Sequence, residues 1–172
     1  MEHQKKIRIQ AILAGFAALL LLVGLDQWTK ALAVEHLAGQ RDIDLIPGVL
    51  TLHYLENRGA AFGILQNQQW IFVLIAAVFF LAATAAYWKM PKTRHYLPMH
   101  ILAVTVTAGA VGNVLDRVRL NYVVDFVYIS LINFPVFNVA DIYVTVSAVL
   151  FFIYVIFYYK EEDFQFLKKR ER

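Results

Sequence analysis

Four long stretches without a charged residue constrain the fold more than any other feature. They cover residues 10–25, 70–88, 99–115 and 142–159, and contain 16, 19, 17 and 18 residues. A helix that crosses a bilayer needs ~20 predominantly apolar residues, with a range of ~17–25. The first and third stretches reach this length if their helices continue past the flanking charges. Short soluble core helices are the alternative, but no amphipathic segment is left to cover them. The pattern predicts an all-α membrane protein with four transmembrane helices.

The overall composition agrees with this interpretation. Hydrophobic residues make up 60% of the 172 residues, charged residues make up 17%, and the mean hydropathy is +0.56. Soluble domains have ~45–50% apolar and ~25% charged residues, and a chain this small could not bury the excess in one core. The absence of cysteine excludes disulfides, zinc-thiolate sites and cysteine nucleophiles. The basic residues lie in short clusters between uncharged stretches, which favours a membrane protein over a nucleic-acid-binding protein.

The distribution of Lys and Arg predicts the orientation in the membrane. Residues 1–9, 89–98 and 160–172 contain 11 of the 16 Lys and Arg residues, so both termini are expected in the cytoplasm. A cleaved signal peptide is the alternative for the N-terminal segment, with Ala31-Leu32-Ala33 as the cleavage site. The polar sequence between the apolar run and that site disfavours it.

The expected domain organisation is one four-span domain over residues 1–172. Its spans are expected at about 10–30, 70–88, 99–117 and 139–159. The run at 43–55 combines β-branched and aromatic residues with a Pro-Gly turn, which predicts a short hairpin or small sheet. We therefore expect a small extracytoplasmic β-sheet at about 40–63. Residues 116–138 are expected to form a second extracytoplasmic loop.

The positions of the acidic residues suggest where chemistry occurs. Asp26, Asp116, Asp125 and Asp141 all lie at the predicted outer ends of the spans or in the outer loops, and the span middles are uncharged. A proton pump or channel usually carries ionisable groups across the membrane's depth. This distribution instead indicates a site at the outer interface.

Asp26 precedes Lys30 by four residues, so the two share a helix face and can form a structural ion pair. The segment Asn57-Arg58-Gly59 leads into small residues, and its spacing fits either an ordinary turn or a binding loop. Both interpretations remain open.

The end of the third span presents polar residues on one face. Gly109, Asn113 and Arg117 are spaced four apart, and Ala108 and Gly112 would let another helix approach closely. For Asn113 and Arg117, structural and functional roles are equally open.

The fourth span begins with Asn138 as a candidate N-cap and Asp141 at the third helical position. Asp141 could therefore be only a capping carboxylate. Asp125, however, is expected in an apolar loop without a local basic partner. If both carboxylates enter one pocket they could share a proton, with one activating water and the other protonating a leaving group.

Five segments together resemble signal peptidase II, the family of bacterial lipoprotein signal peptidases. They are Asp26-Gln-x-Thr-Lys30, Asn57-x-Gly59-Ala60-Ala61-Phe62-Gly63, Ala108-Gly109-Ala110-x-Gly112-Asn113-x-x-Asp116-Arg117, Val123-Val124-Asp125-Phe126 and Phe137-Asn138-Val139-Ala140-Asp141. They occur in the family's order and cover nearly the whole chain. Ala108 stands where the family usually has Gly, and Ile142 stands where it usually has Ser.

The resemblance implies an intramembrane aspartyl endopeptidase of the bacterial inner membrane. It implies prolipoprotein substrates, cut on the N-terminal side of a lipobox Cys that carries diacylglycerol. The catalytic pair falls on Asp125 and Asp141. The substrate-binding residues fall on Asn57, Gly59, Asn113, Arg117 and Asn138, and Asp26, Lys30 and Asp116 are expected to be structural. The family needs no cofactor, has a small β-cradle and is the target of globomycin. Membrane lipid is an expected partner and nucleic acid is not.

Two other classes of function remain at this stage. One is a small transporter or channel, and the other is a structural or assembly protein in which the aspartates only cap and pair. Motifs of serine hydrolases, zinc proteases and P-loop proteins are absent, and the five histidines are scattered. We therefore expect no metal site.

Overall fold

The computed structural model describes residues 2–59 and 68–167 and is mainly helical. The helices are α1 (Glu2–Leu37), α2 (Gln69–Lys89), α3 (Leu97–Leu120) and α4 (Val139–Phe157), with short 3-10 helices at Arg94–Tyr96, Ser130–Ile132 and Glu161–Leu167. Within the described ranges, four helices are long and apolar enough to cross a membrane. The predicted fold class is confirmed. Residues 60–63 of the predicted β region, and the basic residues Lys168, Lys169, Arg170 and Arg172, lie outside the described residues.

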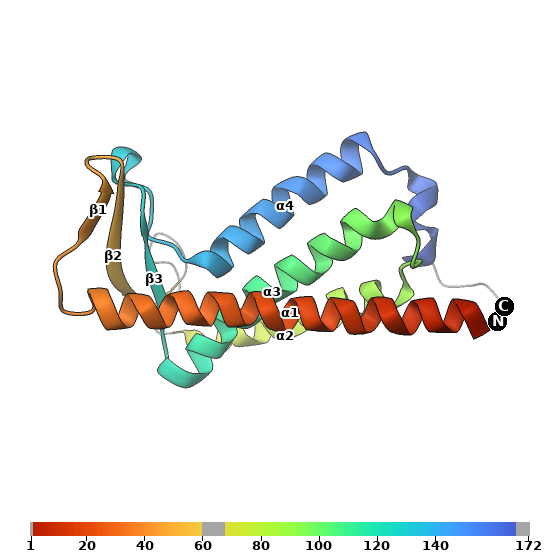
Figure 1. Ribbon diagram of the computed structural model, residues 1–172, viewed down its shortest axis with the longest axis horizontal. Helices are drawn as coiled ribbons and strands as arrows, with labels where there is room; N and C mark the ends of the chain where they lie inside the picture. The colour runs from red at the N-terminus through yellow and green to blue at the C-terminus, as the bar shows by residue number, and fades with distance from the viewer. Residues whose placement is uncertain (1, 60–67, 168–172) are drawn as a thin grey trace.

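The helices and the sheet are arranged end to end. In Figure 1, α1 runs along the whole length of the molecule, and the three strands stand across its C-terminal end. The end of α1 packs on the sheet, because Ala33 and Leu37 form a buried cluster with Val124 and Phe126. The start of α1, the α2–α3 connection and the last 3-10 helix lie at the opposite end (Figure 1). The sheet and the α2–α3 connection therefore lie at opposite ends of the helices.

The sheet consists of three antiparallel strands in the order β1 (Ile43–Ile46), β2 (Leu50–Asn57) and β3 (Val123–Tyr128). The predicted hairpin is confirmed, and its turn contains Gly48 at φ +72, a conformation that glycine adopts readily. The expectation that Asp125 lies in a loop is wrong. Asp125 is on β3, opposite Leu55 of β2, because residues from the two outer segments pair into one sheet.

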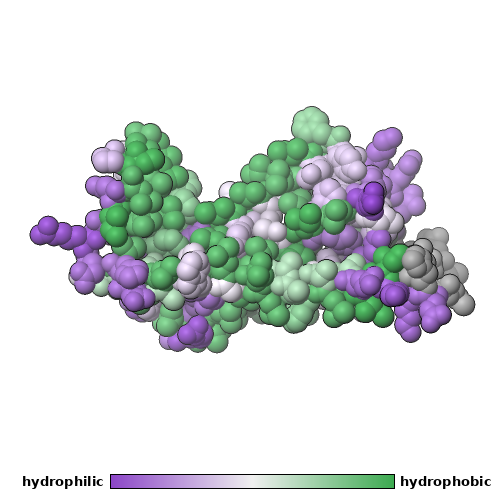
Figure 2. Space-filling view, in the orientation of Figure 1, coloured by the Kyte–Doolittle hydropathy of each residue, from purple (hydrophilic) through white to green (hydrophobic). Residues whose placement is uncertain are grey.

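Most large apolar side chains of the helices point outward. Examples are Leu21 at 73% exposure, Leu81 at 68% and Ile156 at 67%. Figure 2 shows hydrophobic side chains over the middle of the visible face and over the upper part of the sheet end, with hydrophilic side chains along the left and lower left margin and at the right end. A water-exposed surface of this kind would be unfavourable, so the helices present the surface that a lipid environment requires.

Small residues allow α3 to pack closely against its neighbours. A Cβ atom at Gly109 would lie 2.5 Å from the backbone oxygen of Ala140 on α4. A Cβ atom at Gly112 would overlap the Asp26 carboxylate of α1, and Ala108 is fully buried. The predicted close approach at this end of α3 is confirmed, and it brings the polar residues of three helices together.

Candidate active site

Asp125 and Asp141 lie where the sheet meets the helices. Asp125 is on β3 and is 1% exposed, and Asp141 is in the first turn of α4 and is half-buried. Both line the same cavity. The chain reverses between them through the 3-10 helix at Ser130–Ile132, and backbone hydrogen bonds join Val127 to Phe137 on the way back. This return places the start of α4 beside β3.

Two asparagine side chains connect the aspartates. Asn138 Nδ2 donates to Asp125 Oδ1 at 2.7 Å and to Asn113 Oδ1 at 3.0 Å. Asn113 Nδ2 in turn donates to Asp141 Oδ1 at 2.8 Å. On the other side, Asn57 Nδ2 donates to Asp125 Oδ2 at 2.8 Å. The two carboxylates are thus held in one hydrogen-bonded network built from β2, β3, α3 and α4.

The start of α4 has the cap that the sequence predicts. Asn138 Oδ1 accepts from the backbone N–H of Asp141 at 3.0 Å, and Asp141 Oδ2 accepts from the backbone N–H of Asn138 at 3.1 Å. This reciprocal capping box satisfies two helix-terminal donors. Because Oδ1 of Asp141 accepts from Asn113, the capping role and a role in the cavity are compatible.

A buried ion cluster, centred on Lys30 of α1, hydrogen-bonds to Asn113 of this network. Lys30 Nζ lies 3.0 Å from Asp26 Oδ2 and 2.9 Å from Asp116 Oδ2, and it donates to Asn113 Oδ1 at 2.9 Å. The predicted ion pair between Asp26 and Lys30 is confirmed. Asp26 Oδ1 accepts from the backbone N–H of Ala140 at 2.9 Å, so the cluster also fixes the position of α4.

Arg117 and Gly59 lie together at the cavity wall. The Arg117 guanidinium donates to the Gly59 carbonyl at 3.1 Å and lies 4.5 Å from the centre of the Phe72 ring on α2. Its buried Nε has no hydrogen-bond partner among the described residues. Gly59 N–H donates to Asn57 Oδ1 at 3.0 Å. Every predicted site residue is therefore part of one connected cluster, in which Asn138, Asp26, Lys30 and Asp116 do not line the cavity themselves.

Burial raises the pKa of Asp125 to about 7. Loss of hydration is the largest cause, and the nearby Asp141 raises it further, whereas the hydrogen bonds from Asn57 and Asn138 oppose the shift. A carboxyl group with this pKa holds its proton for part of the time at neutral pH. Perturbed carboxyl groups in cavities are frequent in active sites.

The cavity beside the aspartates has a volume of about 570 Å³. The polar residues of its lining are Asn57, Asn113, Arg117, Asp125, Asp141 and Thr145. The other residues of its lining are Gly59, Phe72, Val123, Ile129, Phe134, Pro135, Val136, Phe137, Ile142 and Val146. A cavity with a few convergent polar groups among apolar walls is typical of a binding site.

Sequence analysis did not assign a role to Gln27 or to most of the apolar walls. Gln27 Nε2 donates to Asp116 Oδ1 at 2.8 Å and to the Gly112 carbonyl at 3.2 Å, and it lies 3.3 Å from Asp26 Oδ2. Its position directly after Asp26 was the available signal. In the described part of the chain, no group of three or more His, Asp or Glu side chains is placed to hold a metal ion.

Comparison with known proteins gives a consistent result. The profile of the family described as Signal peptidase (SPase) II matches residues 18–157. The chain is 40% identical to a lipoprotein signal peptidase of Streptococcus thermophilus over 146 residues, which cover 85% of this chain and 92% of the relative. It is 41% identical to one from Streptococcus pyogenes serotype M3 over 147 residues, which cover 86% and 93%.

Two solved structures of a bacterial membrane enzyme have the same fold. The first, determined at 2.3 Å resolution, is 26% identical in sequence and has a TM-score of 0.72. The match covers 92% of this chain and 93% of the solved one. The second, at 1.9 Å, is 27% identical with a TM-score of 0.71, and 85% of this chain covers 94% of it. Both the profile and the relatives span the aspartates, so this chain belongs to the signal peptidase II family of peptidases.

Proposed function

We propose that the protein removes signal peptides from prolipoproteins by aspartyl catalysis with Asp125 and Asp141. The observation that carries this proposal is the network in which Asn138 and Asn113 join the two carboxylates at one cavity. Membership of the signal peptidase II family supports the substrate class. Serine and cysteine mechanisms would need other residues, since the chain has no cysteine and neither serine lines the cavity.

In the proposed reaction, Asp141 accepts a proton from water as the water oxygen bonds to the scissile carbonyl carbon. Asp125, whose pKa is raised to about 7, supplies the proton to the leaving amine as the C–N bond breaks. Asp141 fits the first role because it lies in the first turn of a helix, where the dipole favours a negative charge. Asp141 then releases the proton it took from water, and Asp125 takes up one proton, with solvent carrying the exchange, which restores the starting state.

The cavity walls support a lipidated substrate. Phe134 and Val136 precede α4, and Ile142 and Val146 lie on its first two turns, so apolar surface lies next to both carboxylates. Ile142 and Val146 are also exposed on the surface of α4. We propose that the acyl chains of a diacylglyceryl Cys lie along this surface and that the bond on the N-terminal side of that Cys reaches the aspartates. Globomycin would occupy the same cavity.

The proposed location is the bacterial inner membrane, with the aspartates near the outer leaflet and both termini in the cytoplasm. The charge distribution supports it, because 11 of the 16 Lys and Arg residues lie in segments 1–9, 89–98 and 160–172. A lipidated Cys keeps its acyl chains in the outer leaflet, so the scissile bond would lie at the end that holds the aspartates.

The test is cleavage of a synthetic prolipoprotein by the purified protein, followed by mass spectrometry of both products. The same peptide without diacylglycerol on its Cys is the matched control. The proposal predicts a new N-terminus at the lipidated Cys and little turnover of the control peptide. Cleavage at another bond, or equal rates for the two peptides, would contradict the proposed substrate recognition.

A further inference from the structure

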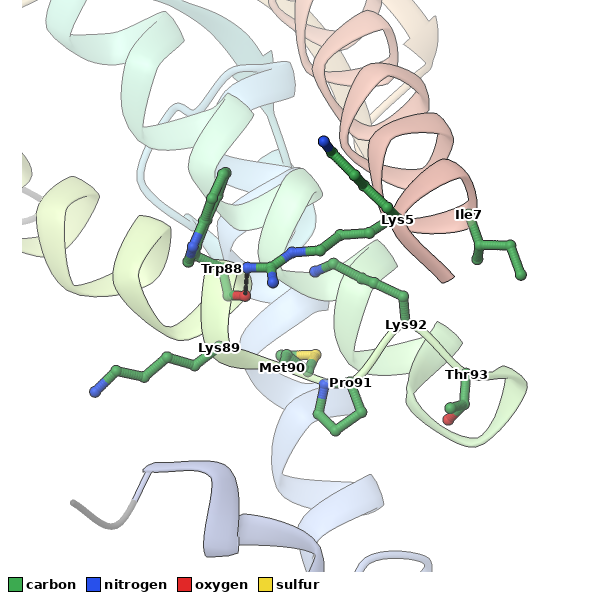
Figure 3. Close-up of a pocket in the computed structure, with 9 residues that line it drawn as sticks. Lys5, Ile7, Trp88, Lys89, Met90, Pro91, Lys92 and Thr93 are labelled. Atoms are coloured by element: carbon green, nitrogen blue, oxygen red, sulfur yellow. Dashed lines mark hydrogen bonds between the residues drawn. The ribbon is translucent and has the colours of Figure 1, made fainter. Parts of the chain in front are cut away.

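A second cavity lies at the end of the molecule opposite the aspartates. It has a volume of about 450 Å³, within the range of ~300–1,000 Å³ typical of small-molecule sites. It lies between the first turns of α1 and the connection from α2 to α3 (Figure 3). Four cationic side chains line it, and we call it the basic pocket. They are Lys5, Arg8, Lys89 and Lys92.

Within residues 2–59 and 68–167, the basic pocket has no carboxylate to balance these charges. No Asp or Glu of the described residues lines it, and none of the four cations forms an ion pair within that part of the chain. Arg8 donates to the Trp88 carbonyl at 3.1 Å, and Lys92 donates to the Tyr87 carbonyl at 2.5 Å. These acceptors orient the side chains but carry no formal charge, so no carboxylate of the described residues neutralises Arg8 or Lys92.

Two of the cations repel each other. Burial lowers the pKa of Lys92 to about 8, and the nearby charge of Arg8 contributes a smaller part of the shift. Holding two like charges close together is unfavourable unless an anion lies between them. The packing keeps both in place, because the Arg8 guanidinium lies 4.7 Å from the centre of the Trp88 ring and Lys92 Nζ lies 3.8 Å from that of Tyr87.

The surroundings favour a lipid over a free anion. Trp88 lines the pocket and is 57% exposed, as expected for an aromatic residue at a membrane interface. Ile7, Met90 and Pro91 add further apolar lining. Basic pockets beside membrane helices at the cytoplasmic surface bind lipid headgroups. We propose that the basic pocket binds the phosphodiester headgroup of an anionic phospholipid in the leaflet opposite the aspartates.

The direct test is native mass spectrometry of the purified protein in detergent, with phosphatidylglycerol compared with phosphatidylcholine. We expect retained phosphatidylglycerol at one site and little phosphatidylcholine. Each cation near a membrane surface strengthens anionic-lipid binding by about fivefold. The Arg8→Gln/Lys92→Gln variant should therefore bind phosphatidylglycerol ~25-fold more weakly. Lys89→Gln, which removes one exposed cation of the pocket, should bind it about fivefold more weakly.

The matched control is Lys6→Gln/Arg94→Gln, which removes two exposed charges from the same end without changing the pocket lining. It should bind phosphatidylglycerol as the wild type does. Equal binding of the two lipids, or equal losses in both double variants, would overturn the proposal. Competition distinguishes the sources of phosphate. Inorganic phosphate at the lipid's own concentration should not displace the lipid, and full displacement would indicate a free-phosphate site instead.

Discussion

The Lys30→Met substitution should destabilise the protein strongly. Lys30 is 3% exposed and lies 3.0 Å from Asp26 Oδ2 and 2.9 Å from Asp116 Oδ2. These aspartates are 0% and 3% exposed, so neither would gain water when the lysine charge is removed. Met fills similar space, so the change removes mainly the charge and the hydrogen bond to Asn113. Removing one partner of a buried ion pair costs ~3–5 kcal/mol.

This loss is large enough to measure in detergent. For a chain of this size, 1 kcal/mol shifts Tm by ~2–4 °C, so the expected fall in Tm is about 6–20 °C. The assay is thermal unfolding followed by tryptophan fluorescence. Lys6→Met is the control, because Lys6 is exposed near the same helix's N-terminus, and it should leave Tm unchanged.

A second substitution tests whether unpaired charge is the cause. Adding Asp26→Asn to Lys30→Met removes one of the two uncompensated carboxylates, so part of the lost Tm should return. The electrostatic account of this cluster would be refuted if Lys30→Met lowered Tm no more than Lys6→Met. It would also be refuted if the double variant were less stable than Lys30→Met alone.

The pH–rate profile should have an alkaline limb near pH 7, because the proposed reaction needs Asp125 protonated and the pKa of Asp125 is raised to about 7. Asn57→Ala should move that limb to higher pH, because the Asn57 hydrogen bond lowers the pKa of Asp125. The pKa of Asp125 rises from 3.8 to about 7 on folding, so wild-type stability should fall as pH rises through this range. The difference between the Tm of Asp125→Asn and that of the wild type should therefore shift in favour of the variant as the pH is raised from 4 to 8. Gly112→Ala should lower Tm, because its Cβ would overlap the Asp26 carboxylate; an unchanged Tm would contradict that contact.

Local sequence patterns predicted several features of the site correctly. The spacing of Asp26 and Lys30 predicted their ion pair, because residues four apart share a helix face. The order Asn138 to Asp141 predicted the capping box for the same local reason. The hairpin followed from alternation and a Pro-Gly turn.

Contacts between distant segments could not be predicted from such patterns. The hydrogen bond from Asn57 to Asp125 joins residues 68 apart, and that from Gln27 to Asp116 joins residues 89 apart. Pairing of β3 with β2 converts the expected loop around Asp125 into a strand, and strand pairing depends on tertiary context. The basic pocket is also formed by segments about 80 residues apart.

The most direct test of aspartyl catalysis compares cleavage of the lipidated prolipoprotein by Asp125→Asn, Asp141→Asn and Asp44→Asn. Asp44 lies on the exposed strand β1 of the same sheet, so its variant controls for loss of a carboxylate elsewhere in that region. General acid–base groups contribute ~10²–10⁴-fold to rate. We predict that the cleavage rate falls at least ~100-fold in each of the first two variants and is unchanged in Asp44→Asn. A cooperative thermal-unfolding transition should show that all three variants are folded. Near-wild-type cleavage by either Asp125→Asn or Asp141→Asn would contradict the proposed catalytic pair.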